Sequence, residues 1–111
     1  MKTKVELSAQ VVRFVGRQAP EPRRALRAGL RGLEREEGDI KALQGPLENY
    51  CRLRVRGYRV ILAYETGAKG QCVIRCIFAD RRSAVYEIFE EMLCKHPDIL
   101  QVKAQENDIE A

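Results

Sequence analysis

The chain has 111 residues, 45% of them hydrophobic, a formal net charge of +4, and 14 arginines among its 20 cationic side chains. This size predicts one globular domain with a modest core, and no apolar run approaches the roughly 20 residues of a membrane-spanning helix. The first residues also lack the apolar stretch of a secretory signal, so we expect a cytoplasmic protein that has no membrane partner.

The N-terminal part predicts one short strand followed by two helices. Residues 3–7 alternate in polarity, as a strand does, and Ser8 is a suitable N-cap for a helix that follows. Glycine and proline end this helix before Pro20, where a second helix begins. The second helix has one apolar stripe, made by Leu26, Leu30 and Leu33. A proline-containing turn between them favours a helical hairpin.

The C-terminal part predicts a loop, three strands and a helix. Residues 41–46 contain glycine and proline and are predicted to form the loop. Strands follow at about 50–56, 58–65 and 71–79, with a tight reversal at Gly57 and a looser hairpin after Thr66. Tyr64 shares the side-chain parity of a predicted core strand. A last helix starts near Ser83 and has a predicted core stripe of Val85, Ile88, Phe89 and Met92.

The predicted order is therefore strand, helix, helix, three strands and a final helix. Short connections between the later strands favour an antiparallel sheet. We expect a single α+β domain over residues 1–96, in which a small antiparallel sheet packs against the N-terminal helical hairpin and the C-terminal helix. Residues 97–111 are rich in acidic side chains and lack periodicity, which is typical of a mobile tail.

Arginines alternate with apolar residues in the strand at 50–56. Because a strand points successive side chains to opposite faces, one face carries Cys51, Leu53 and Val55 and the other carries Arg52, Arg54 and Arg56. The planar guanidinium group can hold two phosphate oxygens at once. This pattern predicts a surface that binds nucleic acid, although arginine enrichment also accompanies a high-GC genome.

The cysteine and histidine content gives little support to a metal site. The only histidine, His96, lies at the edge of the acidic tail, and no Cys-X-X-Cys pair is present among Cys51, Cys72, Cys76 and Cys94. Cys72 and Cys76 are read as small buried side chains. We therefore expect no metal, no disulfide and no small-molecule cofactor.

Two motifs resemble a known family. The first is Leu43-Gln-Gly45 followed by Tyr50-Cys-Arg-Leu-Arg-Val-Arg-Gly-Tyr-Arg-Val-Ile61, and the second is Arg81-Arg82-Ser83-Ala84-Val85-Tyr86. Together with the element order, they resemble the RelE/ParE toxins of type II toxin–antitoxin systems over roughly residues 3–94, with the RelE-like branch favoured. The resemblance implies a small basic toxin that is neutralised by a cognate antitoxin protein.

The RelE branch implies an endoribonuclease. RelE-type toxins cut mRNA in the ribosomal A site without a metal, so the ribosome and mRNA are implied partners and translation is inhibited. The RNA 2′-hydroxyl attacks the adjacent phosphorus while the enzyme removes its proton, stabilises the phosphorane and assists the leaving oxygen. By resemblance, Tyr86 is the base and Arg59 stabilises the phosphorane. Arg82, or its neighbour Arg81, assists the leaving group. The RNA-binding residues are Arg52, Arg54 and Lys41.

Other interpretations of the same residues stay open. A ParE-like protein would inhibit DNA gyrase without catalysis, and a degenerate member would only bind an antitoxin. Arg59 could form a structural ion pair with Glu48, Glu65 or Asp80. Tyr86 lies next to the apolar stripe of the last helix and could be a partly buried helix residue.

Overall fold

The computed structural model describes residues 3–81 and 84–95, which form a five-stranded sheet with helices on both faces. The elements are β1 (Lys4–Leu7), α1 (Ala9–Gly16), α2 (Pro20–Gly32), β2 (Asp39–Ala42), β3 (Cys51–Val55), β4 (Tyr58–Thr66), β5 (Cys72–Arg81) and α3 (Ala84–Lys95). Short 3-10 helices lie at Leu33–Arg35 and Gly45–Leu47. None of the helices in residues 3–81 and 84–95 has the length and hydrophobicity of a membrane-spanning helix. The α+β class is confirmed; the tail predicted at residues 97–111 lies outside the described residues.

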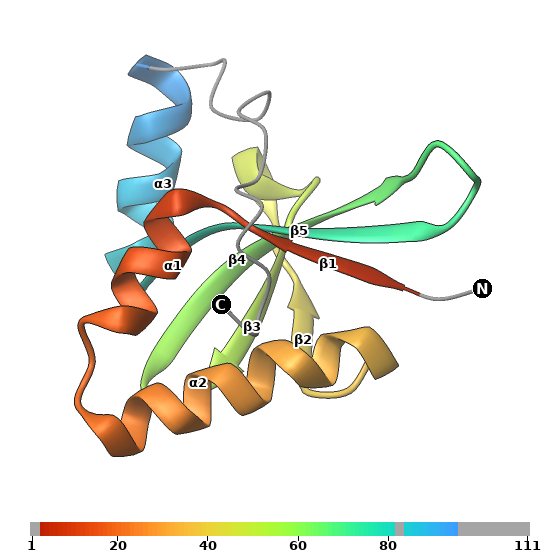
Figure 1. Cartoon of the computed structure of the whole chain (residues 1–111). Helices are drawn as coiled ribbons and strands as arrows, with labels where there is room; N and C mark the ends of the chain where they lie inside the picture. The colour runs from red at the N-terminus through yellow and green to blue at the C-terminus, as the bar shows by residue number, and fades with distance from the viewer. Residues whose placement is uncertain (1–2, 82–83, 96–111) are drawn as a thin grey trace.

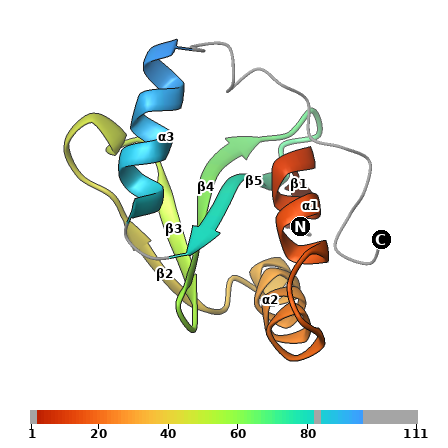
Figure 2. The same cartoon turned by 90° about the vertical axis from the view of Figure 1, so that its left-hand side faces the viewer.

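The sheet has the strand order β1-β5-β4-β3-β2. Strands β2 to β5 pair antiparallel, as predicted for the later strands, but β1 pairs parallel with β5 and makes the sheet mixed. Figure 2 shows the sheet between two helical layers, with α1 and α2 on one side and α3 on the other.

Strand β2 corrects the loop predicted at residues 41–46. Asp39–Ala42 pairs with β3 as an edge strand, with Lys41 opposite Arg52. The sequence gives no strand signal here, because Ile40 is the one partly buried side chain of β2 and the other three are exposed. Pairing with β3, rather than burial, holds this strand in place.

Two apolar clusters lie on the two faces of the sheet. The first cluster joins α1 and α2 to the sheet and includes Val11, Leu26, Leu30, Leu53, Val60 and Leu62. The second cluster lies under α3 and includes Tyr50, Ile61, Phe78, Val85 and Phe89. Alternation along β4 sends Val60 to the first cluster and Ile61 to the second, so both faces of this central strand are covered.

Two side chains predicted to be in the core are exposed. Ile88 is 39% exposed, because the face of α3 that packs on the sheet is centred on Val85 and Phe89, which are four residues apart, and Ile88 lies at the edge of that face. Tyr64 is 44% exposed. Tyr64 lies in the second half of β4, whose hairpin with β5 extends beyond the helices (Figure 1), although its cross-strand partner Ile74 is fully buried.

Close packing and a tight turn fix α2 and the β3–β4 hairpin. A Cβ atom at Gly29 would lie 2.6 Å from Cγ2 of Val55, so α2 approaches β3 at a distance that only glycine permits. The reversal predicted at Gly57 is present, but the left-handed residue is Arg56, with φ of 55°. Arg56 also forms an ion pair with Glu21 of α2, at 3.3 Å.

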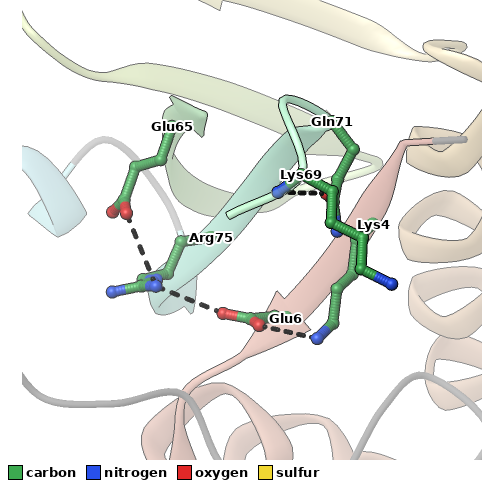
Figure 3. Close-up of polar contacts among 6 residues, drawn as sticks. All are labelled: Lys4, Glu6, Glu65, Lys69, Gln71 and Arg75. Atoms are coloured by element: carbon green, nitrogen blue, oxygen red, sulfur yellow. Dashed lines mark hydrogen bonds and ion pairs between the residues drawn. The ribbon is translucent and has the colours of Figure 1, made fainter. Parts of the chain in front are cut away.

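Ion pairs tie β1 to the sheet at the end far from the β3–β4 turn. Arg75 on β5 places Nη2 3.3 Å from Glu6 of β1 and 3.4 Å from Glu65 of β4, and Lys4 contacts Glu6 at 3.2 Å. Figure 3 shows Arg75 between the two carboxylates. Two cations and two anions balance here, which indicates a structural role.

Candidate active site

Basic side chains gather on the sheet face that α3 covers. Arg54 of β3 is directly opposite Arg59 of β4, and Arg52 is directly opposite both Lys41 and Ile61. Residues that pair directly across strands point to the same face. Ile61 belongs to the cluster under α3, so all four basic residues lie on that face. We call Lys41, Arg52, Arg54 and Arg59 the basic face.

Arg59 is a partly buried cation that no neighbouring group neutralises in the described chain. Its Nη1 atom is buried and has no hydrogen-bond partner among the described residues. Asp80 lies directly opposite it on β5, yet neither Asp80 nor any other described carboxylate forms an ion pair with it. A buried donor without a partner costs about 1–3 kcal/mol, so the fold keeps this group available at a penalty.

Arg52 and Arg54 differ in how freely they present their charge. Arg52 places Nη1 3.5 Å from Oδ1 of Asp39 and donates to the Asp39 carbonyl at 3.1 Å, with 14% of its side chain exposed. Arg54 is exposed, and its Nε donates to the Arg56 carbonyl at 3.4 Å. Asp39, which the sequence interpretation missed, therefore orients Arg52, while Arg54 has no described acidic partner.

Tyr86 lies on the same side of the sheet as Arg59. It is half-buried on the first turns of α3 and packs against the second cluster, which contains Ile61 and Phe78. Strand β5 leads toward α3 through Asp80, the residue opposite Arg59. The structure thus brings Tyr86 and the basic face to one face of the sheet.

Arg81 lies on the opposite face. It pairs with Tyr58, whose ring belongs to the first cluster. Its Nη2 donates to the Tyr58 hydroxyl at 3.4 Å, and its guanidinium carbon lies 5.5 Å from the ring centroid. The hydrogen bond to Tyr58 raises the pKa of the Arg81 guanidinium. The structure therefore does not bring Arg81 to Arg59, and Arg82 lies outside the described residues.

Possible metal ligands and thiols do not gather near these residues. Within residues 3–81 and 84–95, no group of three or more His, Cys, Asp or Glu side chains could hold a metal ion. All four cysteines are free thiols, with Cys76 buried and Cys94 exposed. The basic face itself presents guanidinium and ammonium groups, with the carboxylates of Asp39 and Asp80 beside them.

Comparison with known proteins identifies the fold. No family model and no curated protein matches the sequence. Among solved structures, a chain of the RelBE2 toxin–antitoxin complex from Mycobacterium tuberculosis is similar, with a TM-score of 0.59 at 20% identity, covering 74% of this chain and 100% of that one. A YoeB/ParE toxin from Agrobacterium tumefaciens has a TM-score of 0.56 at 16% identity, covering 71% of this chain and 98% of that one.

A third similar structure is a chain of the RelB–RelE antitoxin–toxin complex from Methanococcus jannaschii, with a TM-score of 0.52 and 18% identity. It covers 76% of this chain and 98% of that chain. All of these matches run almost end to end through the known chains. The protein therefore has the fold of the RelE, YoeB and ParE toxin structures, which confirms the fold expected from the two motifs.

Proposed function

We propose that this protein is the toxin of a type II toxin–antitoxin system and that it cuts mRNA on the ribosome without a metal ion. The observation that carries the proposal is the guanidinium of Arg59, whose buried Nη1 has no described partner and which stands beside Arg54 on the α3 side of the sheet. A phosphate group would supply the missing acceptor and the missing negative charge. The toxin fold supports the same assignment.

The proposed reaction assigns a step to each group. Tyr86 takes the proton of the RNA 2′-hydroxyl, and the resulting oxygen attacks the adjacent phosphorus. Arg59 stabilises the charge that develops on the phosphorane, because a donor fixed in a partly buried site needs no reorganisation as the charge forms. Arg52, Arg54 and Lys41 hold the flanking phosphates. The bond from phosphorus to the 5′-oxygen then breaks, which leaves a 2′,3′-cyclic phosphate, and the 5′-oxygen takes up a proton. Since Arg81 is engaged with Tyr58, the role of stabilising the charge on this departing oxygen falls to Arg82.

The proposed partners follow from the same surface. A cognate antitoxin would place acidic and apolar side chains over the basic face and exclude RNA by electrostatic complementarity. Two of the similar structures are toxin–antitoxin complexes, which supports a protein partner of this kind. The ribosome would supply the mRNA substrate during translation.

Mapping of transcript 5′ ends after brief induction tests the proposal. We expect new ends at codon boundaries within translated regions, and none in purified RNA incubated with the protein alone. Arg59→Met should remove the new ends, whereas Arg24→Met, a matched change on the exposed side of α2, should keep them. Intact transcripts together with linearised DNA and a DNA-damage response would assign a gyrase-directed activity instead. Normal growth without any antitoxin would assign a protein that only binds its partner.

A further inference from the structure

Where β1 ends, side chains of residues 8 and 10 bond to the backbone groups at the outer edge of β5. Strand β1 pairs with β5 only from Val73 to Cys76, although β5 continues to Arg81. The chain then turns into α1 beside the uncovered part of β5 (Figure 1). Ser8 makes the first contact there: its amide donates to the Cys76 carbonyl at 2.9 Å, and its hydroxyl donates to the Ile77 carbonyl at 2.7 Å.

Gln10 continues this contact and takes the place of a strand residue. Its Nε2 donates to the Ala79 carbonyl at 2.8 Å, and its Oε1 accepts from the Ala79 amide at 2.8 Å. One primary carboxamide thus satisfies both backbone polar groups of a residue that is 0% exposed. A neighbouring strand would offer the same pair of one donor and one acceptor.

The position of Ala79 links Gln10 to the candidate site. Ala79 immediately precedes Asp80, which lies directly opposite Arg59, and the same strand leads on toward α3 and Tyr86. Both hydrogen bonds of Ala79 go to Gln10, on the side away from β4, so without the carboxamide its N–H and C=O would be buried and unpaired. The end of β5 would then have to shift to reach other partners.

We infer that Gln10 is a positioning residue of the proposed nuclease, holding the end of β5 so that Arg59 and Tyr86 keep their relative placement. The inference rests on the proposed function for its effect on catalysis. It does not make Gln10 a catalytic residue, because the side chain lies at the edge of β5 away from β4 and its two hydrogen bonds go to the Ala79 backbone. A displacement of about 1 Å between reacting groups can cost about 100-fold in rate, so a residue of this kind would be visible in kinetics.

Kinetics of ribosome-bound mRNA cleavage test the inference with two variants. Gln10→Leu removes both bonds to Ala79 and keeps the bulk of the side chain. We expect kcat to fall about 10- to 100-fold while KM stays within about twofold, because Arg52 and Arg54 on β3 still hold the flanking phosphates. Ser8→Ala is the control: it removes the bond to Ile77 and the N-cap of α1 but keeps both bonds to Ala79, and should leave kcat within about threefold. Equal kcat losses in the two variants, or an unchanged kcat in Gln10→Leu, would overturn the inference.

A third variant separates positioning from simple loss of stability. Gln10→Glu retains one acceptor oxygen but donates to the Ala79 carbonyl only when its carboxyl group is protonated. Partial burial and the facing carbonyl favour the protonated form, so we expect the introduced carboxyl to have a raised pKa in the folded state, and its contribution to be present at low pH and lost as pH rises through that pKa. We expect the protection factor of the Ala79 amide, which is its exchange rate compared with that of an unstructured peptide at the same pH, to be high at acid pH and to fall as pH rises through that pKa in this variant. Wild type should show no such transition, and a variant without one would overturn the inference.

A spectroscopic readout keeps the inference testable if the protein proves not to cleave mRNA. In that case the proposed function fails on wild type, and the Nε–H resonance of Arg59 decides the remaining question. A shift of this resonance in Gln10→Leu, with none in Ser8→Ala, would support a positioning role for whatever ligand Arg59 binds. The same resonance position in all three proteins would overturn it.

Discussion

Arg54 and Arg59 face each other directly across β3 and β4, on the side of the sheet that α3 covers. Like charges in this position destabilise a strand pair by roughly 0.2–1 kcal/mol. Arg59 adds a second penalty, since its buried Nη1 has no partner in the described chain. A bound phosphate would relieve both, so the arrangement favours ligand binding over stability of the free protein.

Replacing Arg59 with methionine should therefore stabilise the protein while abolishing its activity. Arg59→Met keeps an apolar stem of similar width and removes both the unpaired donor and the facing charge. We expect the free energy of unfolding to rise by about 1 kcal/mol and the mRNA-cleaving activity to be lost. Denaturant unfolding followed by circular dichroism measures the first effect, and transcript mapping measures the second.

The matched change Arg54→Met separates the effect of charge repulsion on stability from the effect of the buried unpaired donor. Arg54 is exposed, so Arg54→Met removes the repulsion without removing a buried unpaired group. It should stabilise the protein by less than about 0.5 kcal/mol and weaken RNA binding rather than chemistry. A large loss of stability in Arg59→Met would show that its guanidinium is satisfied in the folded protein and would remove the main support for the phosphate site.

Tyr86→Phe tests the proposed base. The ring would keep its packing against the second cluster, so we expect an unchanged far-ultraviolet circular dichroism spectrum and melting temperature. Loss of general-base catalysis should lower kcat by about 100- to 10,000-fold. Tyr50→Phe is the control, because Tyr50 lies in the same cluster and is buried against Phe89 at a centroid distance of 5.0 Å. Undiminished cleavage by Tyr86→Phe would remove Tyr86 from the mechanism.

Local pattern predicted which face most site residues occupy. Alternation in β3 separates Leu53 from Arg52 and Arg54, because the direction of a strand side chain is set by its neighbours in sequence. Ser8 is an N-cap as predicted, accepting from the Val11 amide at 3.2 Å. The two-layer arrangement follows from the same patterns, since β4 is apolar on both parities.

Contacts between distant segments could not be predicted in this way. Arg52 is oriented by Asp39, 13 residues away, and Arg81 by Tyr58, 23 residues away, both through strand register. The register of a strand depends on the whole set of pairings in the sheet, and a shift of one residue would move all of its side chains to the opposite face. Gln10 has no periodic signal at all, because its role comes from the point at which β1 ends beside β5. Strand β2 was not predicted because only Ile40 in it is partly buried, and the strand forms through its pairing with β3.

The ion pairs of Arg75 should contribute measurably to the attachment of β1. Arg75→Met removes the cation that lies between Glu6 and Glu65 and leaves two carboxylates with no shared partner. We expect a loss of about 1–3 kcal/mol, because the Arg75 side chain is only 22% exposed. Adding Glu6→Gln to this variant should recover part of the loss, and a double-mutant cycle from urea unfolding measures the coupling. Strict additivity of the two changes would show that the ion pair contributes nothing.

Alanine should be unfavourable at Gly29 although the residue lies inside a helix. Alanine ordinarily stabilises a helix by up to about 1 kcal/mol relative to glycine. At Gly29 the new Cβ would lie 2.6 Å from Val55, a stiff β-branched side chain, so we expect Gly29→Ala to destabilise the protein by about 1–3 kcal/mol. Gly32→Ala is the control, since its nearest contacts would be at 3.7 Å, and it should be neutral or stabilising. Equal stability of the two variants would contradict the close α2–β3 packing.

The four free thiols should react at very different rates, and the slowest should report global unfolding. Cys94 is exposed on α3, whereas Cys76 is 0% exposed, and burial raises the pKa of the Cys76 thiol. Because the thiolate is the reactive form, Cys76 is protected both by cover and by protonation. We expect Cys94 to be alkylated at once under native conditions and Cys76 only when the molecule unfolds. Mass spectrometry of peptides after timed labelling measures both rates.

The same measurement checks the stability change predicted for Arg59. If labelling of Cys76 requires unfolding, its rate at equilibrium should fall in proportion to the unfolded population, so a gain of about 1 kcal/mol in Arg59→Met should slow it about fivefold. The rate at Cys94 should not change, because that thiol is exposed in the folded state. Rapid labelling of Cys76 in the native protein would show that the β4–β5 core opens locally, and the two stability measurements would then disagree.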